Sequence, residues 1–274
     1  MTPRKIQRAV DVTQIKCIHI EHVEISSPTN LLIPLVKFRP LTTMSEVKIN
    51  QWDELSKLLF RKRRFDDPIA TNGELLEGFM FVIGRPKCST KNKQFGRIED
   101  TKYEWQNRGE ILSLVGCILV NHEANISPNQ GAFEFASALT FTMSGFKNLP
   151  HVDKDALLYA SGWWFQADKR TGQIQRDASK QCTGGKLIFP NEHSWIYLSE
   201  CHGLSQVVWA SSTFFHYTDP AQGNESMTIV GMSTQCSRRL AKAMWQKSHD
   251  YYQIGDGEGY HIRHGNTISS QLEE

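Results

Sequence analysis

The sequence predicts a mainly β protein with flanking helices, an α+β fold built around a jelly-roll core. Short apolar segments recur at regular intervals in the second half of the chain, and turn residues separate them. Several short strands spaced in this way are typical of a β-sandwich or barrel. With 274 residues, we expect a single domain over residues 1–274. Residues 1–130 would form a supporting region, and residues 131–250 the jelly-roll core with a C-terminal helix.

Mixed elements are expected in the supporting region. Residues 16–25 and 31–38 are rich in Ile, Val and Leu, which predicts two strands. Residues 45–64 carry apolar side chains at helical spacing, with Ser45 in place to cap the helix. Residues 78–84 predict a short buried strand.

Strand and turn patterns continue along the rest of the chain. The polar residues 87–107 predict an exposed loop, and the apolar residues 111–120 fit either a strand or a helix. Seven strands are then predicted, over residues 136–146, 156–166, 185–189, 195–198, 206–210, 213–216 and 227–235. Turn residues separate them, including the pair Asp219-Pro220 after the sixth strand. An amphipathic helix over residues 237–249 and a Gly-rich tail close the chain.

Composition places the chain among ordinary folded proteins and excludes several classes. A net charge of +2 neither requires nor excludes a polyanionic partner. The six cysteines lack a C-x-x-C spacing, so neither a zinc ribbon nor a redox motif is indicated. The N-terminus lacks the apolar core of a secretory signal, and no apolar run is long enough to span a bilayer. We therefore expect an intracellular protein without a membrane partner; the oligomeric state is not predicted.

Three residues are candidate metal ligands and catalytic residues: His151, Asp153 and His216. In an extended segment, His151 and Asp153 point to the same side because they are two residues apart. The third ligand, His216, must come from a distant strand that folds back alongside. Two imidazoles and one carboxylate form the facial triad of non-haem Fe(II) oxygenases. The alternative is coincidence, because H-x-D is a short motif and the chain contains 10 histidines.

The sequence between these ligands resembles that of a known family. After the H-x-D motif come Gly184-Gly185-Lys-Leu-Ile-Phe189, then Gly203 before an apolar strand, and then His216. This order resembles the double-stranded β-helix of 2-oxoglutarate/Fe(II) dioxygenases. Residues 149–219 look more specifically like the Tet-like branch, the relatives of the TET and JBP DNA-base oxygenases found in fungal genomes. The likeness includes the segments at residues 160–165, 168–172 and 236–239.

The resemblance implies a cofactor, two co-substrates and a substrate. Fe(II) would be held by the triad, and 2-oxoglutarate and O2 would react at the iron. The substrate would be a methylated base in DNA, which makes DNA the expected partner and a nuclear location a further expectation. The same chemistry on a protein, RNA or a small metabolite is an alternative. A degenerate jelly-roll binding module without catalysis is another.

The residue that anchors 2-oxoglutarate is not where the family usually has it. These enzymes commonly place an Arg, often as R-x-S, ten to fifteen residues after the second His, because its planar fork matches a carboxylate. Residues 226–231 instead read Ser-Met-Thr-Ile-Val-Gly. Ser226 and Thr228 could donate hydroxyl hydrogen bonds. The candidate cations are Arg238, Arg239, Lys169, Arg170 and Lys186.

Three further features each have two interpretations. One tryptophan of Trp163-Trp164-Phe165 could stack on a nucleobase, although core packing is the commoner role. The Arg-Lys-Arg-Arg run at residues 61–64 could contact phosphates or act as a nuclear address. It could equally be a solvated helix end favoured by the macrodipole. His193 and His202 lie between the ligands and could support the metal site or have no part in it.

Overall fold

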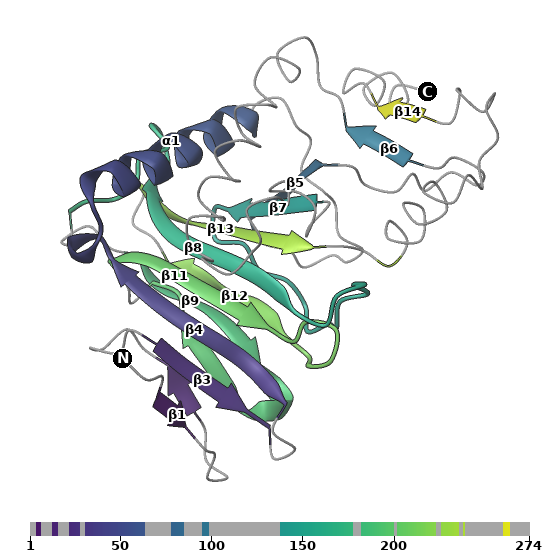
Figure 1. Ribbon diagram of the computed structural model, residues 1–274. Coiled ribbons are helices and arrows are strands. Elements are labelled where there is room, and N and C mark those ends of the chain that lie inside the picture. Colours follow the sequence, from purple (N-terminus) through teal and green to yellow (C-terminus); the bar gives the residue numbers. More distant parts are fainter. Residues whose placement is uncertain are drawn as a thin grey trace.

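The computed structural model shows two β-sheets facing each other, with helix α1 across the larger one (Figure 1). It describes residues 4–6, 13–15, 22–27, 31–63, 78–84, 95–98, 138–177, 182–199, 202–222, 226–235, 238 and 260–263. No helix within these ranges has both the length and the apolar character needed to cross a bilayer.

The larger sheet is almost entirely antiparallel. Its strands, in spatial order, are β1 (Arg4–Ile6), β3 (His22–Ser26), β4 (Leu32–Pro40), β11 (Gly203–Trp209), β8 (Ala160–Asp168), β13 (Met227–Gln235), β7 (Ala138–Met143) and β5 (Phe79–Gly84). Only the pair β1–β3 is parallel. Strands far apart in the sequence are neighbours here, since β11 and β13 lie on either side of β8.

The smaller sheet completes the jelly roll. Its strands, in spatial order, are β12 (Tyr217–Gln222), β9 (Thr183–Phe189), β10 (Ser194–Tyr197) and β2 (Thr13–Ile15). From β8 onwards the chain passes to this sheet for β9 and β10, returns for β11, crosses again for β12 and returns for β13. This alternation confirms the predicted double-stranded β-helix. Separately, β14 (Tyr260–Arg263) pairs with β6 (Phe95–Ile98).

Helix α1 (Glu46–Lys62) confirms the predicted helix and its cap. The Ser45 side chain accepts a hydrogen bond from the backbone N of Lys48, which satisfies one of the free donors at the helix start. The apolar face packs on the outer side of the larger sheet, where Trp52 meets the ring of Phe165 edge-on at 5.7 Å between centroids. Each large apolar side chain fully buried here contributes about 1.5–3 kcal/mol.

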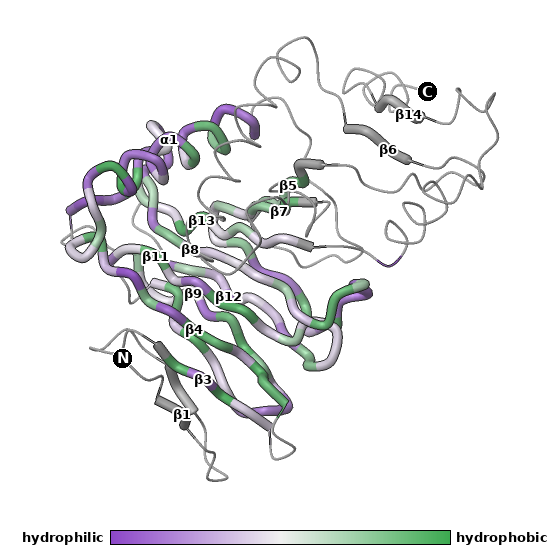
Figure 2. The backbone as a smooth tube through the Cα atoms, in the orientation of Figure 1, coloured by the Kyte–Doolittle hydropathy of each residue, from purple (hydrophilic) through white to green (hydrophobic). Residues whose placement is uncertain are grey.

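A second core fills the space between the two sheets, and β8 contributes to both. Along β8, Trp163 and Phe165 point to the core under α1, and Trp164 points to the core between the sheets. Apolar and polar residues alternate along many strands (Figure 2), whereas β8 is buried on both faces. The aromatic run is therefore core packing, the commoner of its two predicted roles.

The Gly-Gly pair opens β9 for a steric reason. Gly184 and Gly185 have φ values of 72° and 64°, a region that side chains rarely adopt. A Cβ on Gly185 would also come within 2.8 Å of the Ile229 side chain. The pair lets β9 enter the small sheet close to β12 and β13, so its place before the strand is a packing requirement.

Several predicted bounds need correction. Residues 213–216 are not a strand: β11 ends at Trp209, a turn follows, and β12 begins after His216. Asp219-Pro220 is not a turn but part of β12, where Pro is tolerated because β12 is an edge strand.

Other predictions are confirmed only in part. The predicted loop at residues 87–107 contains β6, and β8 begins at Ala160 rather than at residue 156. The predicted first strand is described only from His22 onwards. Residues 111–120 lie outside the described residues, as does the C-terminal helix at residues 237–249 except for Arg238.

Candidate metal centre

The backbone brings the candidate ligands together through a short antiparallel bridge. His151 N donates to His216 O at 3.1 Å, and His216 N donates to His151 O at 2.9 Å. A third bond, from Asp153 N to Ser211 O at 2.9 Å, continues the pairing. The segment after β7 thus lies beside the segment before β12, which is the fold-back that the spacing of the motif predicted.

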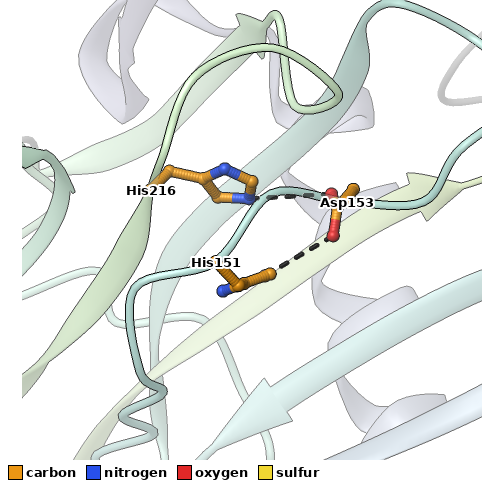
Figure 3. A group of neighbouring side chains, drawn as sticks. All are labelled: His151, Asp153 and His216. Atoms are coloured by element: carbon orange, nitrogen blue, oxygen red, sulfur yellow. Dashed lines mark ion pairs between the residues drawn. The ribbon is translucent and has the colours of Figure 1, made fainter. Parts of the chain in front are cut away.

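The three side chains converge on one point (Figure 3). Their candidate ligand atoms all lie within 4.8 Å of one another. Nε2 of His151 is 3.4 Å from one Asp153 carboxylate oxygen, and Nε2 of His216 is 3.6 Å from the other. Among the described residues, this is the group of His, Cys, Asp and Glu side chains arranged to hold a metal ion.

Both imidazoles are held in the tautomer that a metal requires. Nδ1 of His151 lies 2.8 Å from Leu149 O, and Nδ1 of His216 lies 3.1 Å from Phe214 O. A carbonyl oxygen only accepts, so each Nδ1 carries a proton and each Nε2 is the ring nitrogen that faces Asp153. A metal ion would take the place of the proton through which Nε2 bonds to Asp153. A backbone carbonyl behind a ligating His is the usual way in which proteins orient such a ligand. The donor set therefore fits Fe(II).

Electrostatics within the triad keep the carboxylate ionised. Burial raises the pKa of Asp153, but hydrogen bonds from His151 and His216 outweigh it and hold this pKa well below its ordinary value. The hydrogen bond to Asp153 in turn raises the pKa of His151. Nearby, burial followed by the charge of Asp153 raises the pKa of Asp155 to about 6. Negative charge thus gathers where a divalent cation would bind.

One side of the triad is buried against aromatic rings, and the other side is exposed to solvent. Trp209 meets the His216 ring edge-on at 5.7 Å, and the Phe189 ring lies 6.4 Å from it. The His216 side chain is only 5% exposed, whereas that of His151 is 39% exposed. His216 is thus fixed by the core between the sheets, and His151 borders the solvent.

Of the two predicted hydroxyl anchors of 2-oxoglutarate, Thr228 uses its hydroxyl group in the fold. The Thr228 Oγ1 accepts from Ser144 N at 2.8 Å. Thr228 also shares its strand face with Val230 and Met232, which belong to the core under α1. The backbone O of Ser226 accepts from Lys169 N, beside the turn that follows β8. Their role as anchors stays a prediction, and this arrangement gives it no support.

The predicted cations are spread over the molecule. Lys186 lies over the Tyr197 ring, at 5.2 Å. Arg170 belongs to the turn after β8, and Arg239 lies outside the described residues. Arg238 is the one tied to the metal site, because its Nε donates to Asp155 O at 2.9 Å and its backbone N to Lys154 O. Its role as the anchor stays a prediction.

A small cavity lies between the sheets next to the triad. Its lining consists of Thr142, Gly145, Phe146, Trp164, Gly185, Leu198, Thr218, Asp219, Ala221 and Ile229. Thr218 joins it to the metal site, since it follows His216 by two residues and its backbone N donates to Asn148 Oδ1. Within the described part of the chain, hydroxyl groups line this cavity and no Lys or Arg does. This cavity therefore offers no cation to a carboxylate.

Some contributors to the site escaped the sequence prediction. The two carbonyls behind the imidazoles cannot be seen in side-chain chemistry. Trp209 reads as an ordinary strand residue, whereas the two-residue spacing of Asp155 from Asp153 is a signal that could have found it. By contrast, His193 is an exposed residue with φ 45° after a 3-10 helix (Pro190–Glu192), and His202 has no side-chain partner at its buried Nε2. Neither belongs to the metal-binding group.

Comparison with known proteins agrees with this chemistry. Residues 116–221 match the model of the Tet-like 2OG-Fe(II) oxygenase superfamily, and all three candidate ligands lie within the match. Geometry and match together define the chain as a 2-oxoglutarate- and Fe(II)-dependent dioxygenase. Within that class, residues 116–221 are similar to the Tet-like superfamily. No curated protein sequence matches the chain.

Three solved structures are similar at low identity. One is NgTET1 in complex with 5mC DNA, with 11% identity over 99% of this chain and 91% of that chain and a TM-score of 0.49. Another is a prolyl hydroxylase from Trichoplax adhaerens in complex with a hypoxia inducible factor peptide fragment, with 10% identity, 76% and 86% coverage and a TM-score of 0.41. The third is a Pseudomonas putida prolyl-4-hydroxylase, with 13% identity, 67% and 87% coverage and a TM-score of 0.34. Likenesses of this size do not identify the substrate.

Proposed function

We propose that His151, Asp153 and His216 bind Fe(II) and that the enzyme hydroxylates a C–H bond of a methylated base in DNA. The observation that carries this proposal is the convergence of two Nε2 atoms on one ionised carboxylate, inside the segment that matches the Tet-like family. When bound, the iron would let O2 oxidise 2-oxoglutarate to succinate and CO2, with one oxygen atom inserted into the substrate.

The chain's own residues hold the metal and direct the substrate. Leu149 O and Phe214 O keep the imidazoles oriented, and the core behind His216 excludes water from that side. The substrate would therefore approach from the side of His151, the more exposed ligand. Rigid support of this kind is what holds reacting groups in place.

Exposed apolar side chains lie on the two segments that carry the ligands. Leu149, Leu157, Leu158 and Phe215 are between 43% and 52% exposed. Leu149 and Phe215 flank His151 and His216, and Leu157 O accepts from Ser212 Oγ on the facing segment. Exposed large apolar groups that gather at one place mark a binding surface. They suit the flat face of a base taken out of its stack.

Positive charge accompanies this apolar rim. Lys154 is exposed between Asp153 and Asp155, and Arg238 is exposed and bonded to the same loop. Cations beside an apolar surface suit a base that is attached to phosphates. The combination suits a nucleic-acid substrate.

Turnover on defined substrates tests the proposal. Protein loaded with Fe(II) is given 2-oxoglutarate and O2 with methylated duplex DNA, unmethylated duplex, methylated RNA or a peptide pool. Succinate is measured, and the bases and peptides are examined by mass spectrometry. We expect succinate and an added oxygen atom on methylated DNA, and neither with His151→Ala. The proposal fails if no methylated DNA is oxidised while the His151→Ala protein keeps its full metal content. Oxidation of RNA or peptide alone would show that the substrate is not DNA, while the type of reaction stays as proposed.

A further inference from the structure

A basic hollow lies where the C-terminal end of α1 meets the turn after β8. Its volume is about 370 Å³, and the side chains of Lys57, Arg61, Arg63 and Arg170 line it together with the carboxylate of Glu54. Lys57 and Arg61 lie on α1, Arg63 is the C-cap residue that follows it, and Arg170 lies in the turn. None of them lies in the cavity next to the triad.

The turn that carries Arg170 is held in a fixed shape. Asp168 Oδ1 accepts from the backbone N of Arg170 at 2.9 Å and from that of Thr171 at 2.7 Å. Gly172 then has φ 72°, and a Cβ there would come within 2.9 Å of the Phe60 ring. The turn therefore sits directly on α1, and Arg170 is brought to the helical cations by the backbone.

The helical side of the hollow is also fixed. The guanidinium of Arg63 lies 4.8 Å above the Phe60 ring, and its Nη2 donates to Lys169 O at 3.4 Å. This second contact joins the helix end to the same turn. Pre-positioned cations lose little freedom when they bind an anion, so such a site favours binding.

Cations outnumber carboxylates around the hollow. Lys57 already pairs with Asp53 at 2.8 Å and with Glu54 at 2.9 Å. The Asp168 oxygen that faces Arg170 is occupied by backbone N–H groups. Arg61 is exposed, and no side chain within the described ranges pairs with it. Arginines that converge in this way match the geometry and charge of a phosphate group.

We propose that this hollow binds a phosphate group of a nucleic-acid strand, as a second contact away from the iron site. The choice of nucleic acid as the polymer rests on the proposed function. The two sites lie at opposite ends of β8: Trp209, which packs on His216, pairs with Ala160, and the turn follows Asp168. A strand with this number of residues spans about 26 Å at about 3.3 Å per residue. A duplex that reaches both sites must therefore be about eight base pairs long or longer, at about 3.4 Å per pair.

Binding to DNA of two lengths tests the inference in the full chain. The test variant is Arg61→Gln/Arg170→Gln. The matched control is Lys48→Gln/Arg176→Gln, which removes two charges near the other end of α1. Affinities for a 20-base-pair duplex (about 68 Å) and for a hairpin with a stem of about 6 base pairs are measured by fluorescence anisotropy over a range of salt concentrations. A rescue variant, Arg61→Lys/Arg170→Lys, shows whether charge alone suffices.

We expect the test variant to bind the long duplex on the order of tenfold more weakly at about 0.1 M salt, with a salt dependence shallower by about two phosphate contacts. The control variant should bind the long duplex with the affinity of the wild type. All of the proteins should bind the short hairpin with equal affinity. The Lys variant should recover part of the affinity that the test variant loses for the long duplex. Equal binding of the long duplex by test and control variants would overturn the inference, even if inorganic phosphate binds in calorimetry.

Turnover of the methylated hairpin separates this inference from the proposed function. If the wild type and the test variant oxidise the hairpin equally and bind the long duplex equally, the basic hollow does not bind phosphate and the proposed function is retained. If the wild type oxidises no DNA but the test variant still loses affinity for the long duplex, phosphate binding by the hollow is supported and the proposed function is refuted.

Discussion

The two ends of β8 hold functional side chains by different means. Near Ala160, the proposed iron ligands are positioned by backbone pairing between distant segments and by the core behind His216. Near Asp168, the basic hollow is positioned by one side chain that bonds to its own turn and by a helix end packed on it. The first arrangement resists rearrangement, because moving a ligand breaks a sheet-like pairing. The second depends on single residues.

Removing the charged ligand should have the largest effect. Asp153→Asn keeps the shape of the side chain and removes its charge, so we expect Fe(II) affinity to fall more than about 100-fold. Metal content after dialysis, together with succinate production, measures it. Asp168→Asn is the control at the other end of β8 and should leave iron binding unchanged. A protein with Asn at position 153 and full iron content would show that the triad is not the iron site.

Truncating the wall behind His216 should destabilise the fold. Trp209 is 3% exposed and contacts both Trp164 and His216. Trp209→Ala should therefore lower the free energy of unfolding by about 3–5 kcal/mol and weaken iron binding as well. Chemical denaturation measures the first effect. Val47→Ala, at a position 68% exposed, should change it by less than about 0.5 kcal/mol. Similar losses for both variants would contradict the account of this wall.

Asp155 should make the stability of the metal-free protein depend on pH. Because its pKa is raised to about 6 in the fold, its protonated form is favoured, and its stabilising contribution is lost as the pH rises through about 6. We expect Asp155→Asn to be more stable than the wild type by on the order of 2 kcal/mol at about pH 7.5.

Unfolding with a chelator present, across a range of pH, measures this difference. It should vanish below the ordinary pKa of an aspartate, about 3.9, where both side chains are neutral. A difference that stays constant with pH would assign the effect to packing instead.

The smallest expected effect concerns the turn after β8. Asp168→Ala removes the acceptor of the Arg170 and Thr171 N–H groups, so unfolding should become easier by about 1 kcal/mol. Affinity for long DNA should fall as well, because Arg170 loses its fixed position. Thermal unfolding and anisotropy measure the two effects, with Ser45→Ala as a variant of comparable stability loss. If both variants bind DNA equally, the turn does not organise the hollow.

Much of the fold and of the candidate iron site could be predicted because both depend on periodicity. Alternation in a strand puts His151 and Asp153 on one side, and helical spacing with Ser45 defines α1. Their partners could not be predicted. The carbonyls of Leu149 and Phe214 have no sequence signature, and the strand assigned to residues 213–216 was wrong because an apolar turn there resembles a strand.

The anchor of 2-oxoglutarate shows the same limit. The sequence revealed that the usual Arg was absent, but a replacement depends on which side chains of different strands face one cavity. Thr228 had the right position along the chain and faces the other core. Sequence distance from His216 was therefore a poor guide to which residue lines the cavity.

Binding of 2-oxoglutarate to the Fe(II) protein without oxygen tests the central claim most directly. A keto acid that chelates iron produces a visible charge-transfer absorption band, so no substrate needs to be known. We predict that the band appears when 2-oxoglutarate is added to the anaerobic wild-type protein with Fe(II), and that it is absent with His216→Ala. Full iron binding by the wild type without this band would contradict the account, because the iron would then not accept the co-substrate.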